Sequence, residues 1–133
     1  MKRTLLLLLF GILVNISFAQ EIKSIYTFKK EQQKKIFHYS ELDSLVLYNN
    51  GSFYRRYHYK YHEIKYAELK GNYTIENGLL YLNITANKLS FGDKEWSNCN
   101  EVLTYRIKKK QLIPIPNETY FKSYAKQRLK LKK

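Results

Sequence analysis

The sequence predicts an all-β protein: an antiparallel meander of about seven strands that forms a partly open barrel or a compact sandwich, with room for one short helix. Asn50-Gly51 and Asn77-Gly78 each separate two apolar or aromatic runs, which is the strongest local signal for a hairpin. Apolar and polar residues alternate with a period of two in most runs between residues 53 and 108. Thirteen tyrosines in 133 residues also suit strands. The alternative is a curved sheet with one packed helix.

The N-terminal residues match an export signal. Lys2 and Arg3 supply a positive start, an apolar run follows over residues 5–14, and small side chains precede a cleavage point after Ala19. A membrane-spanning helix needs about 20 apolar residues, so this run is too short for an anchor. We therefore expect export to the periplasm or beyond the cell. Residues 20–133 then form a single β-rich domain with a basic C-terminal tail.

Residues 20–43 carry the weakest pattern in the chain. Apolar residues recur at helical spacing from Ile22 to Phe28, yet the run Ile-Tyr-Thr-Phe favours a strand. We expect a short strand over residues 22–28. A helix or an ordered loop then follows through the charged stretch as far as Tyr39.

The clearest element is a hairpin whose strands span residues 45–48 and 53–61. Its second strand alternates between two faces. The inner face is aromatic and is interrupted by one arginine: Phe53, Arg55, Tyr57, Tyr59 and Tyr61. The outer face is polar and basic: Tyr54, Arg56, His58, Lys60 and His62. The candidate ligand-binding residues on this outer face are Tyr54, Arg56, His58 and Lys60.

A second hairpin follows, with strands over residues 66–75 and 79–85. Gly71 lies inside the first of these strands, where a glycine indicates a bend or a bulge. The next stretch, residues 86–100, predicts a loop around a short strand. Alternation then returns over residues 102–108 and predicts another strand.

The C-terminal part begins with a strand over residues 111–115, after a charged turn. Pro114 predicts an edge position for this strand, because proline cannot donate a hydrogen bond to the ladder. Residues 117–133 allow either a last strand or a helix. On the helix, one face would hold Phe121, Ala125 and Leu129. Residues 126–133 are basic without an acid, which predicts a solvated tail.

One pattern within residues 44–85 resembles a known group of proteins. It consists of Leu45-Val46-Leu47-Tyr48-Asn49-Asn50-Gly51-Ser52-Phe53, then Gly71-Asn72-Tyr73, then Leu80-Tyr81-Leu82. This resembles the L-x-L-x-x-x-G-x-F … G-x-Y … L-x-L pattern of small exported bacterial β-proteins that are described as lipocalin-like and lack an assigned function. The resemblance implies a meander that closes toward a barrel, and a binding role rather than catalysis. It brings no catalytic residue with it.

The charge balance favours anionic partners. The sequence holds 24 basic and 11 acidic residues, and removal of Lys2 and Arg3 with the signal leaves a formal charge of +11. Such a charge attracts lipopolysaccharide, acidic glycans or membrane surfaces. Proteins that read nucleic acids favour arginine, whereas lysine predominates here. We therefore do not expect a nucleic-acid partner.

No motif supports an enzyme, a cofactor or a metal site. The chain lacks a G-x-S-x-G elbow, a P-loop and a dinucleotide fingerprint. His58 and His62 are four residues apart, which on a strand separates them by about 13 Å. That distance is too large for the two to share an ion. Cys99 is the only cysteine, and we expect it to be a buried or incidental thiol rather than a reactive one.

Two binding functions follow from these patterns. The first is a non-enzymatic domain that holds a small or lipidic ligand among its inward-facing aromatic side chains, which predicts an internal pocket. The alternative is a binder of anionic surfaces through Arg56, His58, Lys60 and the C-terminal lysines, which predicts that these residues cluster on one surface. A hydrolase or an isomerase is a third functional class, which no sequence motif supports.

Overall fold

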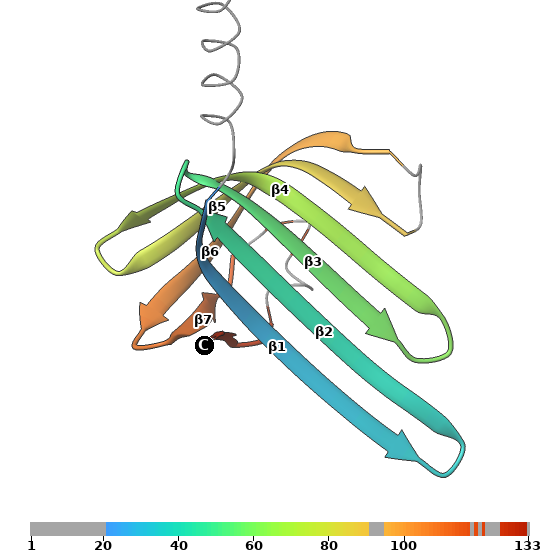
Figure 1. Ribbon diagram of the computed structural model, residues 1–133. Coiled ribbons are helices and arrows are strands. Elements are labelled where there is room, and N and C mark those ends of the chain that lie inside the picture. The colour runs from blue at the N-terminus through green and yellow to red at the C-terminus, as the bar shows by residue number, and fades with distance from the viewer. Residues whose placement is uncertain (1–20, 91–94, 118, 120, 122–125, 133) are drawn as a thin grey trace, which may run out of the picture.

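The structure, a computed structural model, describes residues 21–90, 95–117, 119, 121 and 126–132 (Figure 1). These residues form β1 (Ile22–Lys34), β2 (Phe37–Tyr48), β3 (Ser52–Lys60), β4 (Ile64–Glu76), β5 (Leu79–Leu89), β6 (Ser97–Lys108), β7 (Gln111–Ile115) and β8 (Leu129–Leu131). Each strand pairs antiparallel with the next, and β8 also pairs with β1, so the meander closes into a barrel. The predicted all-β meander and barrel are confirmed.

The part of the chain that the structure describes contains no helix. In these residues, accordingly, no helix has the length and apolar character needed to cross a membrane. The predicted export signal, residues 1–19, lies outside the described residues.

Alternation along the strands decides which side chains fill the barrel. On β2, Leu45 and Leu47 point inward and are buried, while Val46 between them faces outward. Inward positions on the other strands and on the segment before β8 complete the core: Tyr26, Phe53, Leu69, Leu80, Leu82, Ile84, Leu103, Tyr105, Leu112, Phe121 and Leu129. Burying one such side chain stabilises a fold by about 1.5–3 kcal/mol. The apolar core therefore holds the barrel together without a disulfide, since Cys99 is free.

β1 and β2 form a long ribbon, which corrects the expected short strand over residues 22–28 and the helix or loop up to Tyr39. Their ladder continues as far as the pair Lys34 and Phe37. In Figure 1 this hairpin projects at the lower right. The sequence of residues 29–34 does not indicate a strand, because these side chains are all exposed and apolar residues therefore do not alternate with polar ones. Pairing with β2, rather than burial, keeps them extended.

β5 and β6 are longer than the sequence predicts. β5 extends to Leu89 and β6 begins at Ser97, so the predicted loop over residues 86–100 is wrong at both ends. Residues 91–94, within that loop, lie outside the described part of the chain. The added segments, residues 86–89 and 97–101, are extended because Ala86 and Asn87 pair with β6 as well as with β4.

The C-terminal end is a strand where the sequence predicts a solvated tail. Leu129 is fully buried and lies opposite Leu112 of β7. Three residues of the form Leu-Lys-Leu are too few for a pattern, and only closure of the barrel makes them a strand. β7 is thereby paired on both sides, so its predicted edge position is wrong. Pro114 itself lies past Leu112, beyond the residues that β8 reaches. Residues 120 and 122–125, on which the helix alternative depends, lie outside the described residues.

Gly71 allows a close approach between β4 and β5. The register of their ladder shifts between Lys70 and Gly71, which confirms the predicted bulge. A Cβ atom at Gly71 would lie 1.9 Å from the backbone oxygen of Asn83. That oxygen belongs to a paired strand and cannot move aside alone, so only glycine fits at this position.

Gly71→Ala is expected to lower the free energy of unfolding by about 2 kcal/mol or more, because the two strands must separate to admit the methyl group. Gly51→Asn is the matched control. Gly51 has φ of 85° and an open surrounding, and asparagine tolerates that conformation at a cost below about 1 kcal/mol. Urea denaturation measures both. Equal losses would contradict the close approach at Gly71.

Candidate functional site

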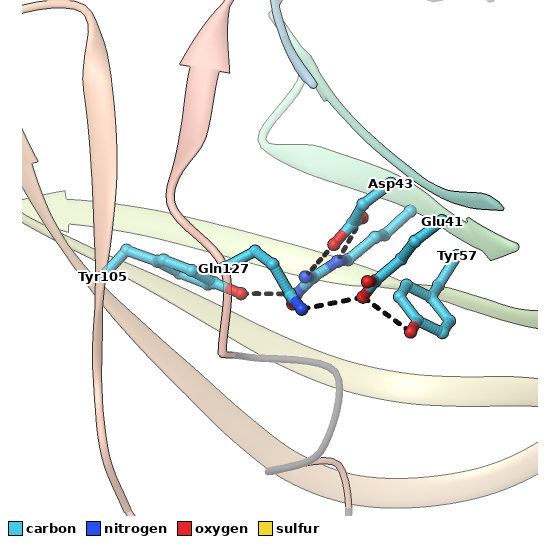
Figure 2. A network of polar contacts seen from close by, with 6 residues as sticks. Glu41, Asp43, Tyr57, Tyr105 and Gln127 are labelled. Carbon is cyan, nitrogen blue, oxygen red and sulfur yellow. Dashed lines mark hydrogen bonds and ion pairs between the residues drawn. The ribbon is translucent and has the colours of Figure 1, made fainter. Parts of the chain in front are cut away.

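An ion pair lies inside the barrel between β2 and β3. Nε of Arg55 donates to Oδ1 of Asp43 at 2.9 Å, and Nη2 donates to Oδ2 at 2.5 Å, so the pair is bidentate. Nη1 of Arg55 donates to the hydroxyl of Tyr105 on β6 at 2.5 Å (Figure 2). All three residues are buried. Burial alone would lower the pKa of the Arg55 guanidinium, but Asp43 and Tyr105 outweigh it and raise that pKa above its ordinary value.

Glu41 is a second buried carboxylate, two residues from Asp43 toward the projecting end of β2. It accepts hydrogen bonds from the hydroxyl of Tyr39 at 2.6 Å, from the hydroxyl of Tyr57 at 2.8 Å and from the side-chain amide of Gln127 at 2.7 Å. The bond to Glu41 raises the pKa of Tyr39 to about 12. Burial, and then the bond to Glu41, raise the pKa of Tyr57 well above its ordinary value. Both hydroxyls therefore remain protonated donors at neutral pH.

Beyond Glu41, toward the projecting hairpin tips, aromatic rings of β2 and β3 pack against one another. The ring centroids of Tyr39 and Tyr59 are 5.4 Å apart, and those of Phe37 and Tyr61 are 5.1 Å apart, both with edge-to-face geometry. Tyr59 lies opposite the buried Glu41, so the predicted aromatic inner face of this hairpin is confirmed. Along the strands, the ion pair lies between these rings and the leucine core. The aromatic run therefore does not continue into the core.

The outward-facing side chains of β1, β2 and β3 form a separate surface. One cross-strand row joins Thr27, Ser44 and Arg56, and the next joins Lys29, Leu42 and His58. Lys132 follows β8, and its backbone N–H donates to the carbonyl oxygen of Ile25 on β1 at 2.8 Å. Closure of the barrel thus places the end of the chain beside these rows.

This surface is hollowed by a groove of about 600 Å³. The lining residues are Thr27, Phe28, Lys29, Leu42, Asp43, Ser44, Arg56, His58 and Lys132. Three of them, Lys29, Arg56 and Lys132, carry a positive charge, and His58 adds an imidazole. The charge of Asp43 is already offset by Arg55 in the interior. Leu42 is 41% exposed and supplies apolar surface.

The structure brings two of the four predicted ligand-binding residues together, since Arg56 and His58 both line this groove. Tyr54 and Lys60 share the outward face of β3 but lie outside the groove. Tyr54 donates its hydroxyl to Glu68 and lines a smaller pocket of about 230 Å³. Burial and this hydrogen bond raise the pKa of Tyr54 to about 12. Lys60 is exposed at the end of β3.

Two lining residues, Lys29 and Leu42, escape the sequence pattern, whereas Lys132 belongs to the C-terminal lysines of the predicted anionic-surface binder. Lys29 falls in the segment that predicts a helix or loop, and Lys132 falls in the segment that predicts a tail. Leu42 lies before the predicted start of its strand. A longer β1–β2 hairpin, in which residue 29 pairs with residue 42, is the signal that would have found both Lys29 and Leu42.

The histidines and the cysteine were the candidates for a metal site in the sequence. Within the residues that the structure describes, no three His, Cys, Asp or Glu side chains lie close enough together to hold a metal ion. The ring of His62 packs against those of Phe37 and Tyr61, with centroids 6.2 Å and 4.1 Å away. Nδ1 of His58 is buried and has no hydrogen-bond partner among the described residues. Cys99 is half-buried.

Comparisons with known proteins add no relative. No family model, curated protein or solved structure matches this chain. A barrel fold alone does not imply a function. The case for a function therefore rests on the side chains of the groove.

Replacing Arg55 by Met is expected to lower the free energy of unfolding by about 3–5 kcal/mol, because Asp43 is left buried without its counter-charge. Combining Arg55→Met with Asp43→Leu and Tyr105→Phe removes all three polar partners at once. This triple variant is expected to recover most of the loss. Urea denaturation of the single and triple variants tests both statements. A triple variant as unstable as the single one would show that the loss comes from packing and not from an unpaired charge.

Proposed function

We propose that this chain is a non-enzymatic, exported binding protein for a small anionic amphiphile. It holds this ligand in the groove on the outer face of β1, β2 and β3. The observation that carries the proposal is the convergence of Lys29, Arg56, His58 and Lys132 around one groove that also exposes Leu42.

The charges of the groove favour an anion. Lys29 forms an exposed ion pair with Glu31 at 3.4 Å, and such a surface pair contributes at most about 1 kcal/mol. Neither Arg56 nor Lys132 forms an ion pair with another residue of the described ranges. Like charges that converge repel one another, and a bound carboxylate, sulfate or phosphate removes that repulsion. Arg56 also offers a planar fork that matches such a group.

The apolar groups of the groove favour a ligand that carries a hydrocarbon part. The exposed side chain of Leu42 lies among the cationic side chains. Phe28 also lines the groove, but its side chain packs against the core. A volume of about 600 Å³ falls within the range of small-ligand sites, about 300–1,000 Å³. A single alkyl chain with an anionic head satisfies both the charge and the apolar surface.

This proposal combines the two functions that the sequence suggests. It keeps the lipidic ligand of the first and the anionic recognition of the second, and it puts the ligand on the outer face of the barrel. Inside the barrel, the ion pair of Arg55 and Asp43 and fully buried leucines occupy the space between the strands. Because these side chains fill the interior, the outer groove is a better candidate for the ligand-binding site than the inside of the barrel.

The purified protein is expected to bind dodecyl phosphate, below its critical micelle concentration, more tightly than two partial probes. Dodecyl maltoside has the same chain without the charge, and inorganic phosphate has the charge without the chain. Isothermal titration calorimetry compares the three. Binding of dodecyl phosphate should weaken when NaCl rises from about 0.05 to about 0.3 M, because exposed charges are screened.

The double variant Arg56→Gln, Lys132→Gln is expected to bind dodecyl phosphate about tenfold more weakly, at roughly 0.7 kcal/mol for each exposed contact. The matched control is Arg106→Gln, Lys108→Gln. It makes the same charge change on exposed residues of β6 that do not line the groove. Equal weakening in both double variants would refute a local site and indicate an effect of net charge alone.

A further inference from the structure

The tips of the β1–β2 hairpin and the β3–β4 hairpin expose large apolar side chains. Ile36, in the turn between β1 and β2, is 93% exposed, and Ile64, at the start of β4, is 59% exposed. Tyr61, in the turn between β3 and β4, is 37% exposed. One exposed isoleucine on a surface is ordinary. Three apolar or aromatic side chains on two neighbouring tips are a feature that needs an explanation.

The two tips touch each other. The ring of Phe37 lies 5.1 Å from that of Tyr61 and 6.2 Å from that of His62, measured between centroids. In Figure 1 both hairpins project on the same side of the barrel. The two tips therefore present one surface, which we name the ribbon tip and define as residues 34–37 and 60–65.

The charge of the ribbon tip is positive. Its exposed basic residues are Lys34, Lys35, Lys60 and Lys65. Its one acidic residue is Glu63. Lysine side chains beside apolar groups can keep their ammonium groups in a polar layer while their stems cover apolar surface.

We propose that the ribbon tip docks the protein on an anionic lipid bilayer, with Ile36 and Ile64 inserted among the headgroups. Apolar side chains at a protruding tip can enter the boundary between headgroups and acyl chains. Tyrosine favours that boundary, and lysines near the surface are attracted to anionic lipids. The charge complementarity of the four lysines selects a bilayer that contains acidic lipids. The ribbon tip is separate from the groove, so this inference does not depend on the proposed function.

The test is co-sedimentation of the purified protein with sucrose-loaded vesicles at physiological salt. The vesicles are pure phosphatidylcholine, or phosphatidylcholine with phosphatidylglycerol at 7:3. The protein is expected to partition at least tenfold more strongly onto the anionic vesicles. The variant Ile36→Ser, Ile64→Ser is expected to lose at least tenfold of that partition. Both residues are exposed, so their replacement leaves the core intact.

The matched control is Ile22→Ser, Ile75→Ser, which replaces two other exposed isoleucines, one at the start of β1 and one near the end of β4. It is expected to partition like the unchanged protein. Equal loss in both pairs, or no loss in the tip variant, would overturn the proposal. Failure of the unchanged protein to bind anionic vesicles would also overturn it and would leave a protein partner as the occupant of the ribbon tip.

The same variants separate this inference from the proposed function. The tip variant is expected to keep the affinity of the unchanged protein for dodecyl phosphate. If Arg56→Gln, Lys132→Gln abolishes vesicle binding while the tip variant retains it, the groove and not the ribbon tip holds the lipid. The docking proposal would then fail while the proposed function stands.

Discussion

The buried ion pair between Arg55 and Asp43 is the constraint on which the rest of the structure depends. Removing two charges from water costs several kcal/mol for each ion, and a bidentate contact with further hydrogen bonding is needed to offset it. The pair and the bond to Tyr105 meet that need only in the observed register, in which Leu45 lies opposite Arg55. A slip of one residue would turn Arg55 outward and bury Arg56 without a partner. The ion pair therefore selects how β2 lies against β3.

The outer groove follows from the same register, because the neighbours of an inward residue on a strand point outward. With Asp43 inside, Leu42 and Ser44 face outward, and with Arg55 inside, Arg56 does so. Closure of the barrel by β8 then adds Lys132 from the far end of the chain. One buried contact thus organises the outer surface of the same strands, and the binding function that we propose depends on both faces of those strands.

Local signals in the sequence were sufficient for the meander, the hairpin turns and the two faces of β3. Asn50-Gly51 and Asn77-Gly78 lie in the predicted turns, with φ of 85° and 75° at the two glycines.

Long-range features of the fold were not predictable from such local signals. The interruption of the aromatic face by Arg55 is visible in the sequence, but its partner Asp43 emerges only from the pairing of two strands. β8 is a strand because the barrel closes there, and the exposed half of β1 is a strand because β2 pairs with it. Alternation alone was enough to predict that Arg56 and His58, two of the four predicted ligand-binding residues, share the outer face of β3. The other residues that line the groove are brought to it by pairing between strands.

The most direct test of the account is a map of backbone amide chemical shifts in ¹⁵N-labelled protein during titration with dodecyl phosphate. A ligand in the outer groove predicts saturable changes that are largest at the amides of residues 27–29, 42–44, 56–58 and at Lys132, with small changes at the amides of Tyr39 and Tyr59. Changes that are largest at the amides of Tyr39 and Tyr59, and absent at Arg56 and Lys132, would contradict the account and place the ligand on the inner face of β2 and β3.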